Sequence, residues 1–271
     1  MPELPEVEII TRNLNQIVKP NEKMLEITFY RKDLRHKIPI KLIKKLIGSE
    51  IKNIYRRAKF IIFEFAEASI VSHLGMTGFW RLENLNWIKR KHDHIVIRLV
   101  ADRFLVYNDA RRFGEFNYFL FSEVSSRFKN FGPEPLAVET DFNKLTVAFK
   151  KMKTLIKVAL MNQKNLVGVG NIYASEALFK AKIKPTRTAN RITQLEYTRL
   201  WLEIKTVLQK AISAGGSSIQ NYQNSYGEKG SFQSQFAVYD RAKQMCLICG
   251  SKIKIANLGG RSTFWCSVCQ K

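Results

Sequence analysis

The first six residues of the chain, Met1 to Glu6, carry groups that could act on a carbonyl-type carbon. Removal of Met1 would leave Pro2 with a free secondary amine, and an α-amino group titrates near about pH 8. A modest decrease of that pKa makes the amine a neutral nucleophile that can form a Schiff base, and Glu3 could move protons for it. The same residues suit the start of a helix, with Glu3 and Glu6 as first-turn acids and Pro5 near the first position. Taken alone, the hexapeptide favours this second interpretation.

A second group of reactive side chains lies at the other end of the chain. Its spacing is C-x2-C-x16-C-x2-C, formed by Cys246, Cys249, Cys266 and Cys269. Two such pairs can direct four thiolates at one tetrahedral zinc ion. The alternative is two disulfides, which a reducing cytosol disfavours. Four thiolates leave no open coordination position, so the pattern predicts one structural zinc ion and no catalytic metal.

Two turns hold side chains that could enter a stack of bases. His73–Gly78 closes a strand with Met76 held between glycines, and Asn108–Gly114 places Arg111 and Phe113 at another strand end. An exposed apolar tip can wedge between bases, and a guanidinium with a ring can fill the space of an extruded base. The alternatives are a methionine of the core and a solvated charged turn.

Other residues suit phosphate binding. The glycines of Val167–Ile172 allow a close backbone approach and direct the N–H groups of the next helix at an anion. A Rossmann turn is the alternative, but no strand precedes this segment and the third glycine is absent. Arg261 lies at the expected hairpin tip between the cysteine pairs and could contact phosphate or a groove. Lys59 is expected in a strand, and His92 lies in a basic run; both residue types are most often at the surface.

The composition favours a polyanionic partner. The 271 residues include 45 Lys and Arg against 23 Asp and Glu, a formal net charge of +22. Nucleic acid is the first candidate for that partner and an anionic membrane surface the second. No apolar run approaches the roughly 18 residues that span a bilayer, and the N-terminus lacks a secretory pattern. We therefore expect a cytoplasmic protein.

The elements that must hold these residues change character along the chain. A helix is expected over residues 7–18, and a short helical segment over 40–46. Short β-rich runs are expected at 54–65, 69–74, 94–100, 103–107 and 115–120. The turn cluster Phe131–Leu136 marks a boundary, after which helices are expected at 141–151, 154–162, 172–181 and 193–213. Residues 214–235 read as a functional or disordered loop. The predicted fold class is α+β, with an N-terminal β-sandwich and leading helix, a C-terminal helical domain and a four-cysteine finger.

Together these motifs resemble the formamidopyrimidine-DNA glycosylase family. They are the opening hexapeptide, the turn His73–Gly78, the run Arg111–Gly114, the segment GVGNIYASE at 168–176 and the cysteine finger, in order along the whole chain. Leu4 separates the chain from the endonuclease VIII branch, which typically has glycine there. The resemblance implies a bifunctional enzyme that removes 8-oxoguanine and formamidopyrimidines and then nicks the strand by β,δ-elimination. It implies no cofactor beyond zinc.

The resemblance also implies roles for individual residues. Pro2 would attack the sugar C1′, Glu3 would be the acid/base residue, and Lys59 would contact phosphate near the reacting sugar. Glu6 would support the site, and Met76, Arg111 and Phe113 would fill the gap left by the flipped nucleotide, with Arg111 facing the opposite cytosine. The remaining expected DNA contacts are His73, His92, Lys157, Asn171, Tyr222 and Arg261. Lys157 and Asn171 would be phosphate ligands in a helix–two-turn–helix element.

The turn cluster and the change in character along the chain predict three domains: 1–133, 134–235 and a zinc finger at 236–271. The resemblance implies that the first is a catalytic β-sandwich and the second a helix–two-turn–helix domain with a lesion-covering loop. One segment departs from the family, because Gln220-Asn221 stands where Arg-Asp is usual. The expected partner is double-stranded DNA with oxidised purines or abasic sites. We expect the protein to bind it as a monomer and to have no membrane partner. The competing hypotheses are a non-catalytic zinc-finger DNA-binding protein and an RNA-binding translation accessory.

Overall fold

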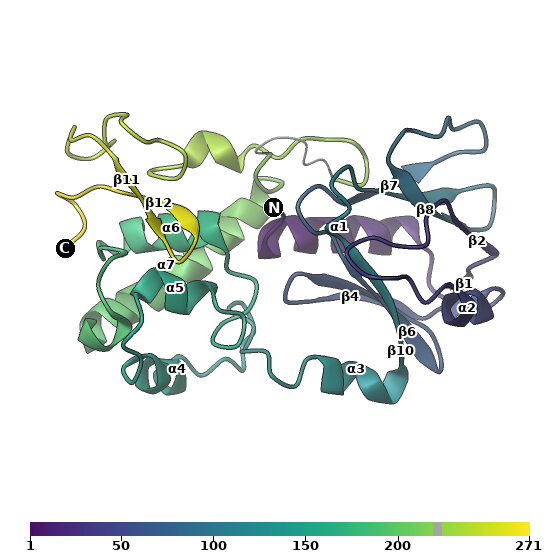
Figure 1. The fold of residues 1–271 in the computed structure, drawn as a ribbon, viewed down its shortest axis with the longest axis horizontal. Coiled ribbons are helices and arrows are strands. Elements are labelled where there is room, and N and C mark those ends of the chain that lie inside the picture. The colour runs from purple at the N-terminus through teal and green to yellow at the C-terminus, as the bar shows by residue number, and fades with distance from the viewer. Residues whose placement is uncertain (219–223) are drawn as a thin grey trace. The chain divides into compact units, whose positions relative to one another are not determined.

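The computed structural model describes residues 1–218 and 224–271. These residues form two compact units (Figure 1). The first comprises residues 1–129 and 214–231, and the second comprises residues 130–213 and 232–271. The loop after residue 213 thus returns to the first unit. The three-domain division with boundaries at residues 133 and 235 stays a prediction. In the part of the chain that the structure describes, no helix combines the length and apolarity needed to cross a membrane.

The first unit is a β-sandwich preceded by helix α1 (Leu4–Ile17). One antiparallel sheet has the order β10-β6-β5-β4, with bounds Glu115–Leu120, Ala68–His73, Phe60–Glu64 and Asn53–Arg57. The other has the order β2-β8-β9-β7, with bounds Glu26–Phe29, Asp93–Arg98, Phe104–Asn108 and Phe79–Glu83. Strands β1 (Glu22–Lys23) and β3 (Glu50–Ile51) form a separate pair. The predicted sandwich with a leading helix is confirmed.

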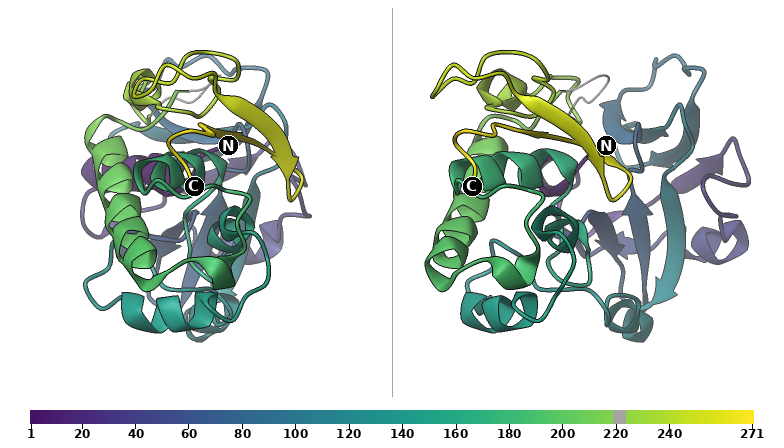
Figure 2. Two further views of the ribbon diagram at one scale, coloured as in Figure 1. Left: turned by 90° about the vertical axis from the view of Figure 1, so that its left-hand side faces the viewer. Right: turned by 60° about the vertical axis from the view of Figure 1, so that its left-hand side comes forward.

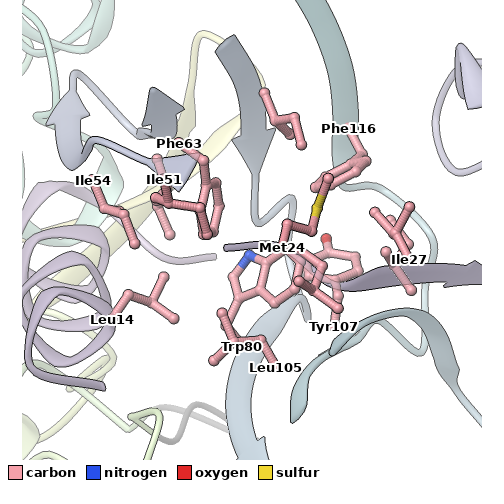
Figure 3. Close-up of a cluster of buried hydrophobic side chains, with 14 of the residues drawn as sticks. Leu14, Met24, Ile27, Ile51, Ile54, Phe63, Trp80, Leu105, Tyr107 and Phe116 are labelled. Carbon is pink, nitrogen blue, oxygen red and sulfur yellow. The ribbon is translucent and has the colours of Figure 1, made fainter. Parts of the chain in front are cut away.

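A single apolar core joins the two sheets and α1 (Figure 3). The Trp80 ring of β7 lies 5.5 Å from Phe63 of β5 and 5.1 Å from Tyr107 of β9. Leu14 of α1 is fully buried in the same core, because apolar residues recur at helical spacing along that helix. Edge-to-face and tilted aromatic pairs at these separations stabilise a core beyond the area they bury. The core therefore fixes the strand ends, where the candidate site residues lie.

Several local expectations need correction. The run 54–65 is a hairpin of β4 and β5, so Lys59 lies in the turn between them and its expected place in a strand is wrong. Ala58, in the same turn, has a left-handed φ of 56°, which a pattern of apolar residues does not reveal. Strands β2 and β7 and helix α3 (Phe121–Arg127) were not predicted. The short helical segment is confirmed as α2 (Ile40–Ile43) followed by a 3-10 turn (Lys44–Leu46).

The second unit is helical and ends in a β-hairpin. Its helices are α4 (Phe142–Phe149), α5 (Ile156–Met161), α6 (Asn171–Lys180) and α7 (Gln194–Ser213), which confirm the four predicted helices. Short 3-10 turns lie at Ala189–Arg191 and Phe232–Gln235. The hairpin of β11 (Lys254–Leu258) and β12 (Arg261–Trp265) packs its second strand against α6 (Figure 2). This packing brings the finger beside the glycine segment that precedes α6.

Candidate active site and nucleic-acid interface

The N-terminus of α1 gathers two buried carboxylates. Glu3 precedes the helix and its carbonyl oxygen accepts the first helical hydrogen bond, from the Val7 N–H (3.1 Å). The Glu6 side chain reaches back to accept a bond from the Glu3 N–H (2.9 Å). Both Glu3 and Glu6 are only 2% exposed, and Pro2 is buried beside them. The residues that the sequence offers for chemistry are therefore the same residues that begin the helix.

The α-amino group lies within electrostatic reach of four predicted site residues. Burial lowers the pKa of the Met1 amine below its ordinary value of 8.0, against the opposing effect of Glu3 and Glu6. Lys59 and Arg111 lower the pKa of that amine further. An amine at this position is thus more neutral near pH 7 than an exposed one. A neutral amine is the form that acts as a nucleophile.

Glu6 also connects α1 to the long loop of the first unit. Its second oxygen accepts a hydrogen bond from the Ser217 N–H (2.8 Å), and this contact is buried. Gly216 has a φ of +80°, and a Cβ there would lie 3.1 Å from Glu6 Oε1. Glycine at this position therefore permits both the backbone conformation and the close approach. The carboxylate of Glu6 orders the helix start and the beginning of the loop together.

Lys59 is held in its turn by an ion pair that starts on α1. Arg56 of β4 donates to Glu8 of α1 (2.7 Å) and to the carbonyl oxygen of Ala58 (2.9 Å). These bonds fix the turn next to the N-terminal helix. Lys59 itself is buried, and its charge acts on the terminal amine. The ammonium group is therefore positioned as part of the N-terminal site.

His73, at the end of β6, is a neutral imidazole. Burial lowers its pKa to about 4, with further lowering by Lys59, Arg35 and Arg127. The Gly75 N–H donates to its Nδ1 (3.0 Å). Because Nδ1 accepts a bond, the hydrogen of the neutral ring lies on Nε2. His73 is therefore prepared to donate from Nε2.

The three residues expected to fill a vacated base site lie in two loops of the first unit. Met76 lies between β6 and β7 and is 36% exposed; Phe113 lies between β9 and β10 and is 44% exposed. Exposure of Met76 excludes the alternative of a methionine in the core. The Arg111 guanidinium lies 4.7 Å from the centre of the Phe113 ring, a cation–π contact. Large apolar tips exposed next to a cation suit insertion into a base stack.

His92 is half-buried just before β8. Its ring centre is 6.4 Å from that of His94, and its carbonyl oxygen accepts a bond from the Asp109 N–H (3.0 Å). The backbone of His92 thus supports the loop that carries Arg111. The DNA contact of the His92 ring stays a prediction.

The second unit brings Lys157, Asn171 and the finger hairpin together. The Lys157 ammonium donates to Asn171 Oδ1 (2.5 Å) and Thr263 Oγ1 (2.7 Å). The Asn171 amide donates in turn to the Ser262 carbonyl oxygen (3.0 Å). Lys157 is fully buried by these contacts, while Arg261 next to them is exposed. The lysine therefore fixes the hairpin against α5 and α6, and Arg261 projects from the fixed hairpin.

The four cysteines form a compact cluster that suits one metal ion. Their Sγ atoms all lie within 4.8 Å of one another, and none of the four forms a disulfide. Zn–S bonds of about 2.3 Å in a tetrahedron require sulfur atoms about 3.8 Å apart. The pairs Cys246–Cys269 (3.9 Å) and Cys249–Cys266 (3.4 Å) are near that separation. The donor set and its geometry therefore fit zinc.

A buried carboxylate attaches this finger to α6. Glu176 accepts hydrogen bonds from the N–H groups of Ala237, Val238 and Tyr239 at 2.8–2.9 Å. Burial raises the pKa of Glu176, although the three bonds oppose the increase. The sequence analysis noted Glu176 only as the last residue of the GVGNIYASE segment and gave it no role of its own. An acidic residue in the middle of a helix, followed by the apolar run Ala177–Phe179, was the available signal.

Other contributing residues were missed as well. Glu8 and Arg56 form the pair that positions Lys59, and Asp109 bonds both loops that carry the exposed tips. A buried acid directly after a strand, as at Asp109, is the signal that could have found one of them. Tyr222 and the Gln220-Asn221 departure lie outside the described residues, so their predicted roles stay predictions.

The fold and the site define a two-unit protein with an amine-and-carboxylate site, exposed apolar tips and a four-thiolate finger. Two protein-family models match the chain, one in its N-terminal part and one in its C-terminal part. Residues 1–116 match the formamidopyrimidine-DNA glycosylase N-terminal domain, and residues 131–223 match the H2TH domain of the same family.

Full-length relatives agree. The chain is 45% identical over 271 residues to the formamidopyrimidine-DNA glycosylase of Bdellovibrio bacteriovorus, with 100% of both chains covered. It resembles wild-type Lactococcus lactis Fpg (MutM) in complex with N7-benzyl-Fapy-dG DNA, with a TM-score of 0.92, 35% identity and 100% of both chains covered. A Lactococcus lactis Fpg complex with abasic-site DNA gives a TM-score of 0.91 at 36% identity, covering 99% of each chain. The chain belongs to the formamidopyrimidine-DNA glycosylase family.

Proposed function

We propose that the protein is a bifunctional DNA glycosylase and abasic-site lyase that removes oxidised purines from double-stranded DNA. The observation that carries the proposal is that the amino terminus of the chain lies within electrostatic reach of Glu3, Glu6 and Lys59, all of which are buried, as is Pro2. Membership of the family supports it, since relatives of known structure bind Fapy-dG and abasic-site DNA. The substrates are formamidopyrimidines, 8-oxoguanine and abasic sites in duplex DNA.

The nucleophile is the Pro2 nitrogen after removal of Met1. Its lone pair forms a bond to C1′, and the damaged base leaves with the electron pair of the glycosidic bond and takes up a proton. Opening of the sugar ring between C1′ and O4′ gives an iminium ion, and Glu3 supplies the proton that O4′ gains. Glu6 holds the helix start in place. Lys59 contacts the phosphate beside the reacting sugar.

The iminium ion makes strand cleavage a consequence of the same intermediate. It acidifies the C2′ proton, and loss of that proton breaks the C3′–O bond and releases the 3′ phosphate. Loss of a further sugar proton then releases the 5′ phosphate, which completes β,δ-elimination. Met76, Arg111 and Phe113 fill the vacated base position, with Arg111 at the opposite cytosine. His73, His92, Lys157, Asn171, Tyr222 and Arg261 are the remaining proposed DNA contacts.

We also propose one zinc ion, bound by Cys246, Cys249, Cys266 and Cys269. When bound, the ion cross-links the two cysteine pairs and stabilises the finger. The fit of the four thiols to a tetrahedral ion supports this assignment. A cytoplasmic, monomeric protein is the matching proposal for location and assembly, because reduced thiols and access to DNA are both required.

Covalent trapping tests the nucleophile. Borohydride should reduce the iminium ion and link the protein to lesion-bearing duplex DNA. A variant that retains Met1, and separately Pro2→Gly, should lose most of the trapped product, whereas Pro20→Gly after α1 should trap as the unaltered protein does. Mass spectrometry should place the deoxyribose on the Pro2 nitrogen. Full trapping by the Met1-retaining protein, or deoxyribose on an internal side chain, would contradict the assignment.

A further inference from the structure

A buried carboxylate joins the two loops that carry the exposed tips. These loops, residues 74–78 and 109–114, are called the wedge loops here. Asp109 is fully buried. Its Oδ1 accepts a hydrogen bond from the Thr77 hydroxyl of the first wedge loop (2.5 Å), and its Oδ2 accepts one from the Gly114 N–H at the end of the second (2.8 Å). One side chain thus holds both loops.

The Thr77 hydroxyl continues this connection to Arg111. Its oxygen accepts a bond from the Arg111 N–H (3.0 Å) while its hydrogen is donated to Asp109. A hydroxyl can accept and donate at the same time, which a methyl group of the same size cannot do. The backbone of Arg111 is therefore set by a side chain of the other loop.

Glycines bring the wedge loops into contact at the level of the backbone. A Cβ at Gly75 would lie 2.3 Å from the Phe113 carbonyl carbon, and Cβ atoms at Gly78 and Gly114 would lie 2.3 Å and 1.8 Å from the Tyr107 hydroxyl. The Tyr107 ring packs against Trp80 in the core (Figure 3). Its hydroxyl also lies 3.5 Å from Asp109 Oδ2. The core therefore limits the movement of both loops.

The backbone of Asp109 is fixed on its other side. Its N–H donates to the His92 carbonyl oxygen (3.0 Å), and its carbonyl oxygen lies 2.8 Å from His94 Nε2. Burial lowers the pKa of His94, so the ring is neutral near pH 7 and donates from Nε2. Both backbone polar groups of Asp109 are thus bonded to the segment His92–His94.

We propose that Thr77 and Asp109 are positioning residues, which lock the wedge loops into one preformed wedge and hold Arg111 in register with the opposite base. This inference rests on the proposed function, in which Met76, Arg111 and Phe113 fill the vacated site. Two loops ordered before binding lose less conformational entropy on insertion than two independent loops. A fixed Arg111 backbone also makes its contact with cytosine a contact of defined geometry.

Thr77→Val tests the lock, because it keeps the size of the side chain and removes both hydrogen bonds. Single-turnover excision of 8-oxoguanine opposite cytosine should fall roughly tenfold, the effect of about two ordinary hydrogen bonds. Excision opposite adenine should fall less, so the cytosine-to-adenine ratio should decrease. Thr77→Ser should restore the ratio to that of the unaltered protein. Thr28→Val, on strand β2, is the matched control and should leave the ratio unchanged.

A second measurement does not depend on catalysis. Duplex DNA with a tetrahydrofuran abasic analogue and 2-aminopurine beside it reports wedge insertion as a fluorescence change. The unaltered protein and Thr77→Ser should give a rapid full change, and Thr77→Val a slower or smaller one. An unchanged signal and an unchanged ratio in Thr77→Val would overturn the lock.

The two measurements separate the lock from the proposed function. Absence of excision by the unaltered protein, with a normal insertion signal that Thr77→Val reduces, would overturn the glycosylase proposal and support the lock. Absence of both excision and insertion in the unaltered protein would overturn both proposals.

Discussion

At the scale of single residues, the N-terminal site contains a carboxylate that is buried but hydrogen-bonded. Glutamate is rarely fully buried unless it is paired, and the Glu6 carboxylate meets that condition by accepting hydrogen bonds from the Glu3 and Ser217 N–H groups. The Glu3 and Glu6 carboxylates both act on the terminal amine. Their burial therefore serves the helix start and the proposed proton transfers at once.

Glu3→Gln should separate chemistry from binding. Glutamine keeps the size of the side chain but cannot donate a proton as a carboxylic acid, so turnover should fall by a factor of about 10² to 10⁴. Affinity for duplex with a tetrahydrofuran abasic analogue should change little. Glu26→Gln on β2 is the matched control. Single-turnover excision and equilibrium binding measure the two effects, and normal turnover by Glu3→Gln would favour a non-catalytic DNA-binding protein.

His73 should make the stability of the protein depend on pH. Its pKa is about 4 in the folded protein against an ordinary value of 6.5, so the unfolded chain binds more protons between these values. The free energy of unfolding should therefore rise with pH through that window, by less than about 1.4 kcal/mol per pH unit, and the full contribution should be present above pH 6.5. Lys59, Arg35 and Arg127 face the ring and act in the same direction.

Chemical denaturation at pH values from 4 to 7 measures this effect. His73→Gln keeps an acceptor for the Gly75 N–H and should flatten the slope. His36→Gln alters an exposed histidine and should retain it. An equal slope in the unaltered protein and in His73→Gln would show that other groups carry the pH dependence.

At the scale of elements, the buried Lys157 joins α5, α6 and the finger hairpin. Lys157→Met should lower the free energy of unfolding by about 1–3 kcal/mol, because Asn171 Oδ1 and Thr263 Oγ1 lose their donor. Lys144→Met, at an exposed site on α4, should be nearly neutral. Thermal unfolding measures the difference.

The salt dependence of DNA binding distinguishes the two roles assigned to Lys157. A phosphate ligand should contribute about 0.9 to the slope of log affinity against log salt. A lysine that positions the hairpin should weaken binding with a smaller change of slope. If Lys157→Met reduces the slope of log affinity against log salt by about 0.9 and leaves stability unchanged, Lys157 is a phosphate ligand, as the resemblance implies.

Removal of zinc should act first on the finger. The finger core holds few apolar side chains besides the cysteines, and small metal modules unfold when the ion is removed. Treatment with a chelator should therefore abolish DNA binding, and added zinc should restore it. Circular dichroism should show that most helix content of the second unit is retained. Unchanged affinity of protein shown to be free of metal would contradict the coupling.

The elements differ in how far the sequence predicts them. Long apolar periodicities predicted α6 and α7, and the cysteine spacing predicted the cluster of Sγ atoms, because both signals are local. β7 was missed, since Arg81 interrupts its apolar pattern and is satisfied by an ion pair with Asp93, far along the chain. The turn at Ala58 depends on a left-handed backbone conformation. The Asp109 lock depends on hydrogen bonds between loops that are distant in the sequence. Only the folded chain reveals contacts of that kind.

At the scale of the whole molecule, the formal charge of +22 creates a field that attracts DNA regardless of sequence. The candidate contacts are distributed over both compact units: Lys59, His73 and the wedge loops in the first, and Asn171 and Arg261 in the second. Binding that uses both units should neutralise several phosphates. Affinity should therefore fall steeply with salt, and a nearly flat titration would contradict contacts in both units.

Arg261 provides the sharpest test at this scale, because it is exposed while its hairpin is fixed by Lys157. Arg261→Gln should reduce the salt slope by about 1 and weaken binding to damaged and undamaged duplexes alike, as expected for a phosphate contact. Lys41→Gln on α2 removes the same charge from an exposed helix and measures the effect of net charge alone. Anisotropy titrations over a range of salt concentrations give both slopes. If the two variants lose equal slope, the finger hairpin attracts DNA only through its charge and makes no defined contact.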